Sequence, residues 1–478
     1  MTRFIGIDLG TTFLKGAVLD LDRCVVGPAR RVPAPDPVSG LPPTRHELDP
    51  AAVVSAVRRL AAELLDEALD AVGLVLCSQM HGLVLTDARG NARSNAVTWK
   101  DQRGLEPAAH GPGSVADNLT RTLTEDEQHQ TGRELRPGVP ITTLRWFQDR
   151  GLLEPDTYPA ALPDFVLANL CGCEPTTDPT NAAAHGLFDL SRNDWHRDLI
   201  ARLGLDGLRW PRVRPFGDLV GIADIAGRQV PCFTPVGDQQ CALVGGGLGE
   251  RELSLNIATG SQVSLLSRDL PRGEFQVRPY FDGLWLRTLV QIPAGRSLAV
   301  LVELLTEISR AAGVDGPDPW AYIGRAVEIV PETDLDVDLA FFASLTGDRG
   351  RIANIRENNL TVGHLFAAAF RWMGQHYAKC AGVVSPGREW DRVVFSGGLA
   401  HAFSRLRREI LDHLTHPPHR LSPTSEDTLR GLLTLAQVCA GRAKTVADAG
   451  RMVAEAEATP QNSPQMTQTS TQMKSRSD

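Results

Sequence analysis

The sequence predicts an α/β protein with two similar halves, and three observations support this fold class. Apolar strand-like runs alternate with a long helix-like segment in the first half, as in layered α/β folds. A strand, a small polar turn and a second strand occur at residues 4–20, and the same pattern returns at residues 252–266. The 478 residues of the chain favour two or three domains over one. We therefore expect a duplicated fold with domains over residues 1–245 and 246–458.

Strands and one helix are predicted for the first part of the chain. Strands are expected at residues 4–7 and 16–21, and a buried strand at residues 73–77. Further strands are expected at residues 82–86 and 96–99, on either side of the turn-forming sequence DARGN. A helix is expected at residues 50–71 because apolar side chains recur there three or four positions apart. These side chains are Val53, Val54, Val57, Leu60, Leu64, Leu65 and Leu69.

The second half is predicted to end in a strand followed by helices. The apolar run at residues 393–395 indicates a strand, and residues 402–414 have the apolar spacing of a helix. A last helix is expected at about residues 427–440. Residues 459–478 are polar and contain almost nothing to bury, so we predict that this tail is disordered.

Composition favours an ordinary soluble globular protein. Hydrophobic residues make up 42% of the chain and charged residues 22%, and the net charge is −8. This charge argues against a nucleic-acid-binding surface. No run of about 18 apolar residues and no signal peptide is evident, so we expect no membrane span and a cytoplasmic protein. Eight cysteines, mostly inside apolar runs, are typical of buried thiols in a reducing compartment.

The turn of the first hairpin has the composition of a phosphate-binding loop. Gly10, Thr11 and Thr12 present backbone N–H groups and two hydroxyls near one point, which suits phosphate oxygens. Asp8 at the end of the preceding strand is a candidate ligand of hydrated Mg²⁺, and Lys15 is a candidate cation. For this stretch alone, a plain β-hairpin with an aspartate-led turn is an equal alternative.

Two further turns strengthen the nucleotide hypothesis. Thr259, Gly260 and Ser261 offer the same donors from the second half, so a polyphosphate can be held from both sides. Gly397 and Gly398 follow a strand and precede a helix, where their small size permits an adenosine to approach the backbone. A Gly-Gly turn after a strand is common, so it carries weight only together with the other two.

These three turns, in this order, resemble the two phosphate motifs and the adenosine motif of the actin-like ATPase superfamily. Within it, the sequences SQMHG, TWKDQR and GDQQC resemble the sugar-loop, W-x-D-x-R and GD-x-x-x segments of the FGGY carbohydrate kinases. The resemblance extends over about residues 3–445. It implies two ribonuclease H-like domains, each a mixed sheet flanked by helices, with the active site in the cleft between them. It also implies ATP and Mg²⁺ as cofactors, a sugar substrate, and a monomer or homodimer with no nucleic-acid or membrane partner.

The same resemblance supplies the candidate acceptor residues. Hydrogen-bonding side chains and one aromatic face are the groups that sugar recognition needs. The implied substrate-binding residues are Gln79, Met80, His81, Trp99, Asp101, Arg103 and Asp238. Asp178 and Asn181 match a further family segment that we interpret as structural. Phe13, Ala258 and Leu399 depart from the usual nucleotide motifs.

Asp238 is the implied catalytic base, and with Asp8 it is a candidate metal ligand. Phosphoryl transfer depends mainly on positioning and charge neutralisation, but one group must still accept the proton of the sugar hydroxyl. Asp238 follows a glycine and opens a helix-like run, so the structural alternative is a simple helix cap. A helix N-terminus favours an ionised carboxylate, so both interpretations can hold together.

The implied acceptor is a ketose. The sequence QMHG is unlike the glycerol kinase loop, and GDQQC, NIATGSQ and VRPYFDG resemble segments of sedoheptulose kinases. Sedoheptulose phosphorylated at its terminal hydroxyl is the first hypothesis, with Gln239, Gln240 and Gln262 as candidate partners of its extra hydroxyls. Xylulose, or another ketose or polyol, is the alternative. A catalytically silent protein that binds sugar and nucleotide for regulation is the alternative of a different class.

Overall fold

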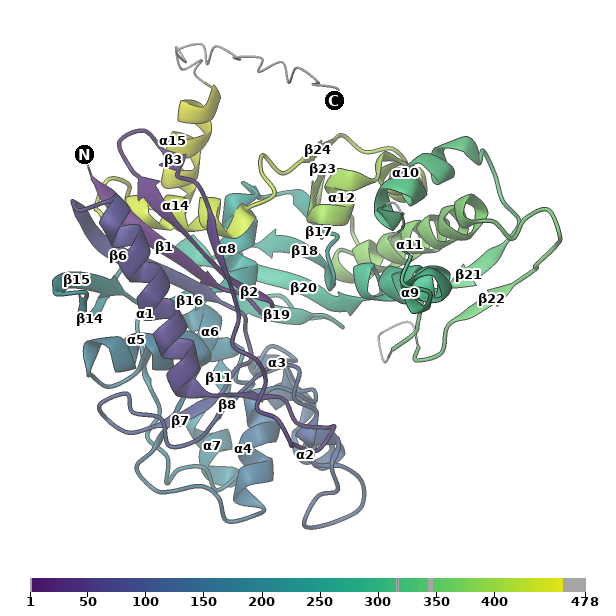
Figure 1. The fold of residues 1–478 in the computed structure, drawn as a ribbon. Helices are drawn as coiled ribbons and strands as arrows, with labels where there is room; N and C mark the ends of the chain where they lie inside the picture. The colour runs from purple at the N-terminus through teal and green to yellow at the C-terminus, as the bar shows by residue number, and fades with distance from the viewer. Residues whose placement is uncertain (1, 315, 317, 343–346, 459–478) are drawn as a thin grey trace, which may run out of the picture.

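The computed structural model describes residues 2–314, 316, 318–342 and 347–458, and contains two mixed sheets (Figure 1). The first has the strand order β14-β15-β6-β1-β2-β3, with β16 also paired to β6 and β4 to β2. Its strands are β1 (Arg3–Leu9), β2 (Phe13–Asp20), β3 (Val25–Val26), β4 (Arg30–Pro33), β6 (Ala71–Ser78), β14 (Leu219–Ile225), β15 (Arg228–Phe233) and β16 (Val236–Gly237).

The second sheet repeats the pairing at the centre of the first. Its order is β19-β20-β18-β17-β23-β24. Its strands are β17 (Glu252–Asn256), β18 (Ser261–Ser267), β19 (Gln276–Pro279), β20 (Trp285–Ile292), β23 (Arg392–Ser396) and β24 (His419–Leu421). In the first sheet β1 is antiparallel to β2 and parallel to β6, and in the second β17 is antiparallel to β18 and parallel to β23. The two predicted hairpins therefore occupy equivalent places. The boundary at residue 245 itself stays a prediction.

Helices bury both faces of the first sheet. Ile5 and Ile7 of β1 pack in one cluster with α1 (Pro50–Glu67) and α5 (Leu162–Cys171). Phe4 points to the opposite face, where α8 (Asp238–Gly245), α14 (Asp427–Cys439) and α15 (Val446–Ala458) form the cover. The last two helices, yellow in Figure 1, thus lie beside the N-terminal strands in purple. The end of the chain completes the sheet with which the chain begins.

The second sheet packs on the long helix α11 (Val362–Val384) and belongs to the largest buried cluster. The other helices around it are α9 (Gly295–Ala311), α10 (Pro319–Ile329), α12 (Gly398–Ala402) and α13 (Ser404–His413). A short ladder of β21 (Asp336–Asp338) and β22 (Arg351–Ala353) lies at the far end of this half (Figure 1).

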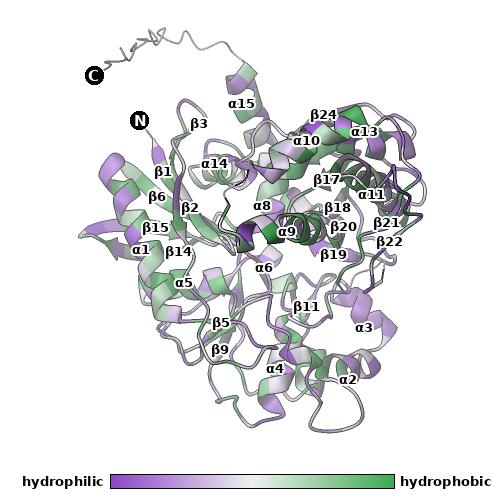
Figure 2. Ribbon diagram, turned by 45° about the vertical axis from the view of Figure 1, so that its right-hand side comes forward, coloured by the Kyte–Doolittle hydropathy of each residue, from purple (hydrophilic) through white to green (hydrophobic). Residues whose placement is uncertain are grey.

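Short elements, nearly all of them between β6 and β14 in the chain, form the lower part of Figure 1. Its helices are η1 (Arg103–Leu105), α2 (Val115–Thr122), α3 (Glu125–Gln130), α4 (Pro140–Gln148), α6 (Pro179–Ala183) and α7 (Arg197–Arg202). Its two-stranded ladders are β5 (Glu47–Leu48) with β8 (Ala96–Val97), β7 (Val84–Thr86) with β9 (Tyr158–Ala160), β10 (Thr176–Thr177) with β13 (Arg212–Val213), and β11 (Phe188–Asp189) with β12 (Asp194–Trp195). Figure 2 shows α3 as hydrophilic, in agreement with its sequence EDEQHQ and its lack of buried residues.

Two predicted helix boundaries are wrong, each for a local reason. The helix expected at residues 50–71 ends at Glu67, because Ala68 leaves the helical conformation and Leu69 is 75% exposed in the turn before β6. The helix expected at residues 402–414 is observed as α13 (Ser404–His413), but it starts two residues later because the backbone of Phe403 is extended and separates it from α12. The two hairpins and the last helix are confirmed within one or two residues at most ends. The tail at 459–478 lies outside the described residues.

The contact between α8 and α14 fixes the start of α8 on the first sheet. A Cβ at Gly431 would lie 2.0 Å from the carbonyl oxygen of Cys241, and one at Gly245 would lie 1.7 Å from that of Asp427. The two helices therefore approach each other backbone to backbone, which only glycine permits. Because α8 begins at Asp238, this crossing also positions the candidate base.

We predict that Gly431→Ala lowers the free energy of unfolding by about 1–3 kcal/mol or more, because the added methyl must displace the backbone of α8. Gly450→Ala in α15 is the matched control, since nothing lies within 4 Å of a Cβ at that helical glycine. This control should be neutral or stabilise by up to about 1 kcal/mol. Urea unfolding of both variants tests the crossing, and equal stabilities would contradict it.

Candidate active site

The first candidate phosphate loop joins β1 to β2 in a tight turn. A Cβ at Gly10 would lie 2.7 Å from the carbonyl oxygen of Phe13, so the turn requires glycine. The N–H groups of Thr11 and Thr12 have no acceptor among the described residues. Such free, neighbouring N–H groups are what an anion needs.

The first loop is connected to the sugar loop by side chains. Trp99 Nε1 donates to Thr11 Oγ1 at 3.1 Å, and that hydroxyl donates to Gln79 Oε1 at 3.2 Å. Trp99 keeps 37% of its surface exposed. These two hydrogen bonds join Thr11, a candidate phosphate-binding residue, to Trp99 and Gln79, which are candidate sugar-binding residues. The candidate phosphate loop and the candidate sugar loop are therefore neighbours.

The second candidate loop joins β17 to β18. Thr259 and Gly260 are exposed, and the Thr259 carbonyl accepts from Arg296 at the start of α9. Ser261 differs from the expectation because its side chain is buried. Its hydroxyl donates to the Asn256 carbonyl and is contacted by the hydroxyl of Tyr377. Only the backbone of Ser261 therefore remains available to a phosphate.

A cavity of about 800 Å³ opens beside the second loop. Its lining includes Thr259 and Gly398, together with the aromatic rings of Trp320 and Phe403. This volume lies within the range of small-molecule sites, which is roughly 300–1,000 Å³. Gly397 has φ +85°, and a Cβ there would lie 2.6 Å from the Ile257 carbonyl oxygen, so the turn below the cavity requires glycine. The cavity has the size and lining that a nucleoside needs.

Two neighbouring carboxylates, Asp8 and Asp238, differ in exposure, since Asp8 is buried and Asp238 is partly buried. Asp8 is 5% exposed and accepts from Thr428 Oγ1 at 2.7 Å, and its pKa is raised mainly by burial. Asp238 is the first residue of α8. Burial, with the charge of Asp8 second, raises the pKa of Asp238 to about 7, while Arg278 acts in the opposite direction. A carboxyl with a pKa near neutrality is suited to general base catalysis.

Lys15 lies close to this pair but is already engaged. Its Nζ lies 2.9 Å from Glu426 Oε2, just before α14. Lys15 also lowers the pKa of Asp8, although less than Thr428 does. The positive charge of Lys15 therefore acts on Asp8 from a distance, while its direct ion-pair partner is Glu426.

The donor set fits a hydrated Mg²⁺. Asp8 and Asp238 are carboxylates whose mutual repulsion a cation would relieve, and Mg²⁺ is usually held by one or two carboxylates plus waters and phosphates. Among the described residues, no group of three or more His, Cys, Asp or Glu forms a complete protein cage.

An ion network that no sequence motif indicated lies next to the base. Glu134 is fully buried and contacts His81 Nε2 at 3.0 Å and Arg278 Nη2 at 3.1 Å. Arg278 also donates to the Gln239 amide oxygen, and its Nη1 lies 3.7 Å from Met80 Sδ. The signal that identifies Arg278 in the sequence is a charged residue inside the otherwise apolar stretch VRPYF.

His81 is held neutral and in a strained backbone conformation. Its φ is +65°, which is uncommon for a residue other than glycine. Burial, with the nearby charge of Arg136 second, lowers the pKa of His81 to about 3. A strained residue in a site is retained when its surroundings fix it, and here Glu134 and Arg136 do so.

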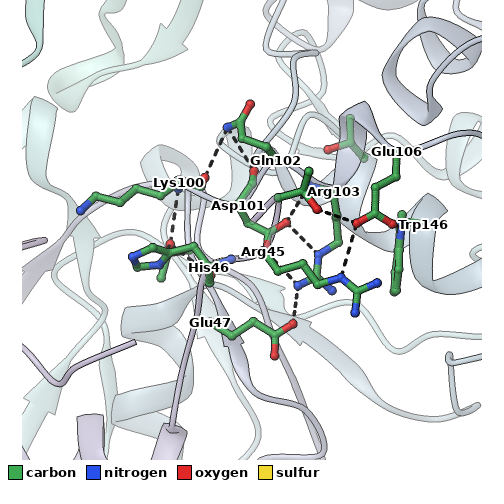
Figure 3. A network of polar contacts seen from close by, with 12 residues as sticks. Arg45, His46, Glu47, Lys100, Asp101, Gln102, Arg103, Glu106 and Trp146 are labelled. Carbon is green, nitrogen blue, oxygen red and sulfur yellow. Dashed lines mark hydrogen bonds and ion pairs between the residues drawn. The ribbon is translucent and has the colours of Figure 1, made fainter. Parts of the chain in front are cut away.

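Asp101 and Arg103 are sequestered from the open part of the site (Figure 3). They are 0% and 1% exposed, and Arg103 Nε donates to Asp101 Oδ1 at 2.8 Å. Asp101 also accepts from the His46 backbone, and the Arg103 guanidinium lies 4.9 Å from the centre of the Trp146 ring. Their polar groups are used within the protein, so they hold the segment that carries Trp99.

Two of the glutamines proposed as partners of the extra sugar hydroxyls also use their side-chain amides for hydrogen bonds within the protein. Gln239 Nε2 donates to Thr288 Oγ1 at 3.0 Å, and Gln240 Nε2 donates to the Pro279 carbonyl at 3.3 Å. Both side chains are buried. Gln262 is half-buried on β18, and its side chain has no hydrogen-bond partner among the described residues.

The paired sheets, their two polar loops and the adjoining cavity define the actin-like ATPase fold. The ligand-bound xylulose kinase from Lactobacillus acidophilus matches with a TM-score of 0.80 at 15% identity, covering 94% of this chain and 92% of that one. Plasmodium falciparum glycerol kinase with ADP matches with a TM-score of 0.79 at 16% identity, covering 95% and 92%.

The chain belongs to the FGGY family of carbohydrate kinases, whose N-terminal domain matches residues 3–245. Mouse sedoheptulokinase is 24% identical over 457 residues, covering 85% of this chain and 91% of that protein. Glycerol kinase of Agrobacterium fabrum is 28% identical over 255 residues, about half of each chain. The protein is therefore a phosphotransferase with an alcohol acceptor that uses ATP and a sugar. No helix among its described residues is long and apolar enough to cross a membrane.

We predict that Asp238→Asn lowers kcat by at least about 100-fold while ADP binding is retained, since general base catalysis contributes about 10²–10⁴-fold. Asparagine keeps the shape of the side chain but cannot accept the proton. Steady-state kinetics and calorimetric titration with ADP measure the two effects. A kcat close to that of the wild type would remove Asp238 from the role of base.

The same variant should be more stable than the wild type above pH 7. The folded-state pKa of Asp238, about 7, exceeds the ordinary 3.8, so ionisation destabilises the folded protein as the pH rises from about 4 to 7. Asparagine removes this cost, which amounts to at most about 4 kcal/mol for three pKa units. Thermal unfolding without nucleotide at pH 4 and pH 8 tests this. A difference that does not grow with pH would contradict the raised pKa.

Proposed function

We propose that the protein transfers the γ-phosphoryl group of ATP, with Mg²⁺, to the terminal hydroxyl of a ketose, with sedoheptulose as the first choice. The observation that supports the chemistry best is the pair of interacting carboxylates Asp8, near the end of the first strand, and Asp238, whose pKa is raised to about 7 by desolvation and by the charge of Asp8. A carboxylate whose pKa is near 7 accepts a hydroxyl proton at neutral pH.

The roles of the individual residues follow from their places. Asp238 accepts the proton of the sugar hydroxyl, and the loops at Gly10–Thr12 and Thr259–Gly260 hold the phosphates through backbone N–H groups. Mg²⁺ held by Asp8 and Asp238 supplies charge neutralisation at the phosphates when it is bound. Trp99 offers an aromatic face to the acceptor. The two halves close around the substrates, because the two phosphate loops lie in different sheets.

Support for sedoheptulose comes from the relatives that align with most of the chain. The mouse protein named sedoheptulokinase aligns over 85% of this chain, whereas the glycerol kinase aligns over 50%. Xylulose is the second candidate, since the fold is shared with a xylulose kinase. A silent regulatory protein is disfavoured, because Asp8, Thr11 and Asp238 are all present.

We predict that sedoheptulose has the highest kcat/KM in a panel that also contains D-xylulose, D-ribulose and glycerol. One additional hydrogen bond of about 1.4 kcal/mol corresponds to a tenfold preference over xylulose. Coupled measurement of ADP release with each acceptor, on one enzyme preparation, provides the comparison.

Acceptor-free ADP release is the control in this experiment. A preference for xylulose would replace sedoheptulose by the second candidate. Absence of turnover with every acceptor, in a protein that still binds ATP, would favour the regulatory alternative.

A further inference from the structure

We propose that Arg136 determines acceptor specificity by donating hydrogen bonds to sugar oxygens remote from the hydroxyl that is phosphorylated, and that Glu134 positions it. Both residues lie in the loop between α3 and α4. This inference rests on the proposed function, because it needs a polyhydroxylated acceptor at Asp238.

The loop that carries these residues is fixed against the second sheet. The Gly132 carbonyl accepts from Val277 N of β19 at 3.1 Å. A Cβ at Gly132 would lie 2.2 Å from the Val277 carbonyl oxygen, so the two backbones are in close contact. The acceptor side is thus assembled from both halves of the chain, and its geometry is set before a ligand arrives.

Glu134 has no capacity left for a ligand. Its Oε1 accepts from Arg278 Nε, and its Oε2 lies 3.1 Å from Arg278 Nη2 and 3.0 Å from His81 Nε2. Arg136 Nη1 lies 3.4 Å from the same Oε2. A buried carboxylate in contact with two guanidinium groups stays ionised, and the Arg278 charge in particular holds the pKa of Glu134 well below its usual range despite burial. Its role is therefore to hold the two arginines and the imidazole in place.

Arg136 is only partly satisfied by the protein. Its Nη2 lies 2.9 Å from His81 Nε2, the same nitrogen that contacts Glu134, and a neutral imidazole nitrogen cannot both accept from Arg136 and donate to Glu134. The Gln276 amide, turned with its oxygen toward the guanidinium, lies 2.9 Å from Nη1. Its Nε has no acceptor among the described residues. The side chain keeps 18% of its surface exposed, in contrast to the 2% of Arg278. Arg136 is therefore the member of the network that can still donate outward.

The network adjoins the end of the site where the acceptor must lie. His81 and Met80 belong to the sugar loop, and a Cβ at Gly237, directly before Asp238, would lie 3.1 Å from Met80 Sδ. A sugar whose reacting hydroxyl reaches Asp238 therefore extends past Met80 toward Arg136.

The chemistry of a guanidinium defines the class of acceptor. Its planar set of N–H groups suits two neighbouring oxygens, such as vicinal hydroxyls or a hydroxyl beside a carbonyl. A short acceptor such as glycerol leaves these donors unpaired, and unpaired buried donors discriminate strongly against such a substrate. Arg136 thus selects long polyhydroxylated acceptors over short ones.

The test compares Arg136→Ala and Arg136→Lys with the wild type. We expect KM for the preferred sugar to rise about tenfold or more in Arg136→Ala, the loss that corresponds to at least one hydrogen bond from a charged donor. Lysine should restore part of this loss. KM for ATP and acceptor-free ADP release should not change, because Arg136 is remote from the nucleotide cavity in its contacts.

Arg133→Ala is the matched control. Arg133 lies in the same loop and is also 18% exposed, but its ion pairs are with Glu125 and Glu274 on the surface. It should leave KM for the sugar unchanged. A similar rise in both alanine variants would mean that loop stability alone is measured, and would overturn the proposal.

Deoxygenated analogues of the preferred sugar identify the oxygens that Arg136 contacts. The wild type should lose affinity for an analogue that lacks such an oxygen, and Arg136→Ala should lose nothing further. Two results would overturn the inference while the proposed function stands. One is that the wild type and Arg136→Ala lose the same affinity for every deoxygenated analogue. The other is that KM for the preferred sugar in Arg136→Lys equals that of the wild type. If the wild type phosphorylates no sugar, the proposed function fails, and the inference fails with it.

Discussion

The presence of Asp8 and Asp238 in one poorly solvated site is the constraint on which the rest of the structure depends. Desolvation raises the pKa of Asp238, and the charge of Asp8 raises it further. Relief comes from distant parts of the chain. Thr428 of α14 donates to Asp8, and Arg278 of β19 acts on Asp238. The last helices and the second sheet must therefore both pack against the first sheet before the site is complete.

Arg278 connects the candidate acceptor residues to Asp238, the candidate base. It is buried, it is paired with Glu134, and its charge opposes the rise in the pKa of Asp238. A buried arginine is costly unless it is paired and hydrogen-bonded, and Glu134 and Gln239 satisfy that condition. The same cation therefore stabilises the ion network around Glu134 and favours the ionised form of Asp238.

The sequence predicted what local patterns encode and missed what depends on distant partners. The two hairpins and the position of Asp238 at a helix start follow from short apolar and polar patterns. The Glu134–Arg278 pair joins residues 144 positions apart, so no local pattern reveals it. Asp101 was expected at the sugar because its segment resembles a motif, yet burial against Arg103 depends on tertiary packing. Helix ends were missed where a single residue, such as Ala68, leaves the helical conformation.

The placement of the fixed and the open contacts restricts how the two halves can close. At the acceptor side, Gly132 and Val277 are hydrogen-bonded backbone to backbone, and buried ion pairs lie beside them. At the nucleotide side, the cavity among α9, α10 and α12 is open and lined by one half alone. Separating the backbones of Gly132 and Val277 would expose a buried ion pair to water. Narrowing the cavity among α9, α10 and α12 buries only the cavity walls and its ligand. We therefore expect a closing motion of the two halves to pivot about the contact between Gly132 and Val277, so that the candidate sugar site keeps its geometry while the second candidate phosphate loop approaches the first.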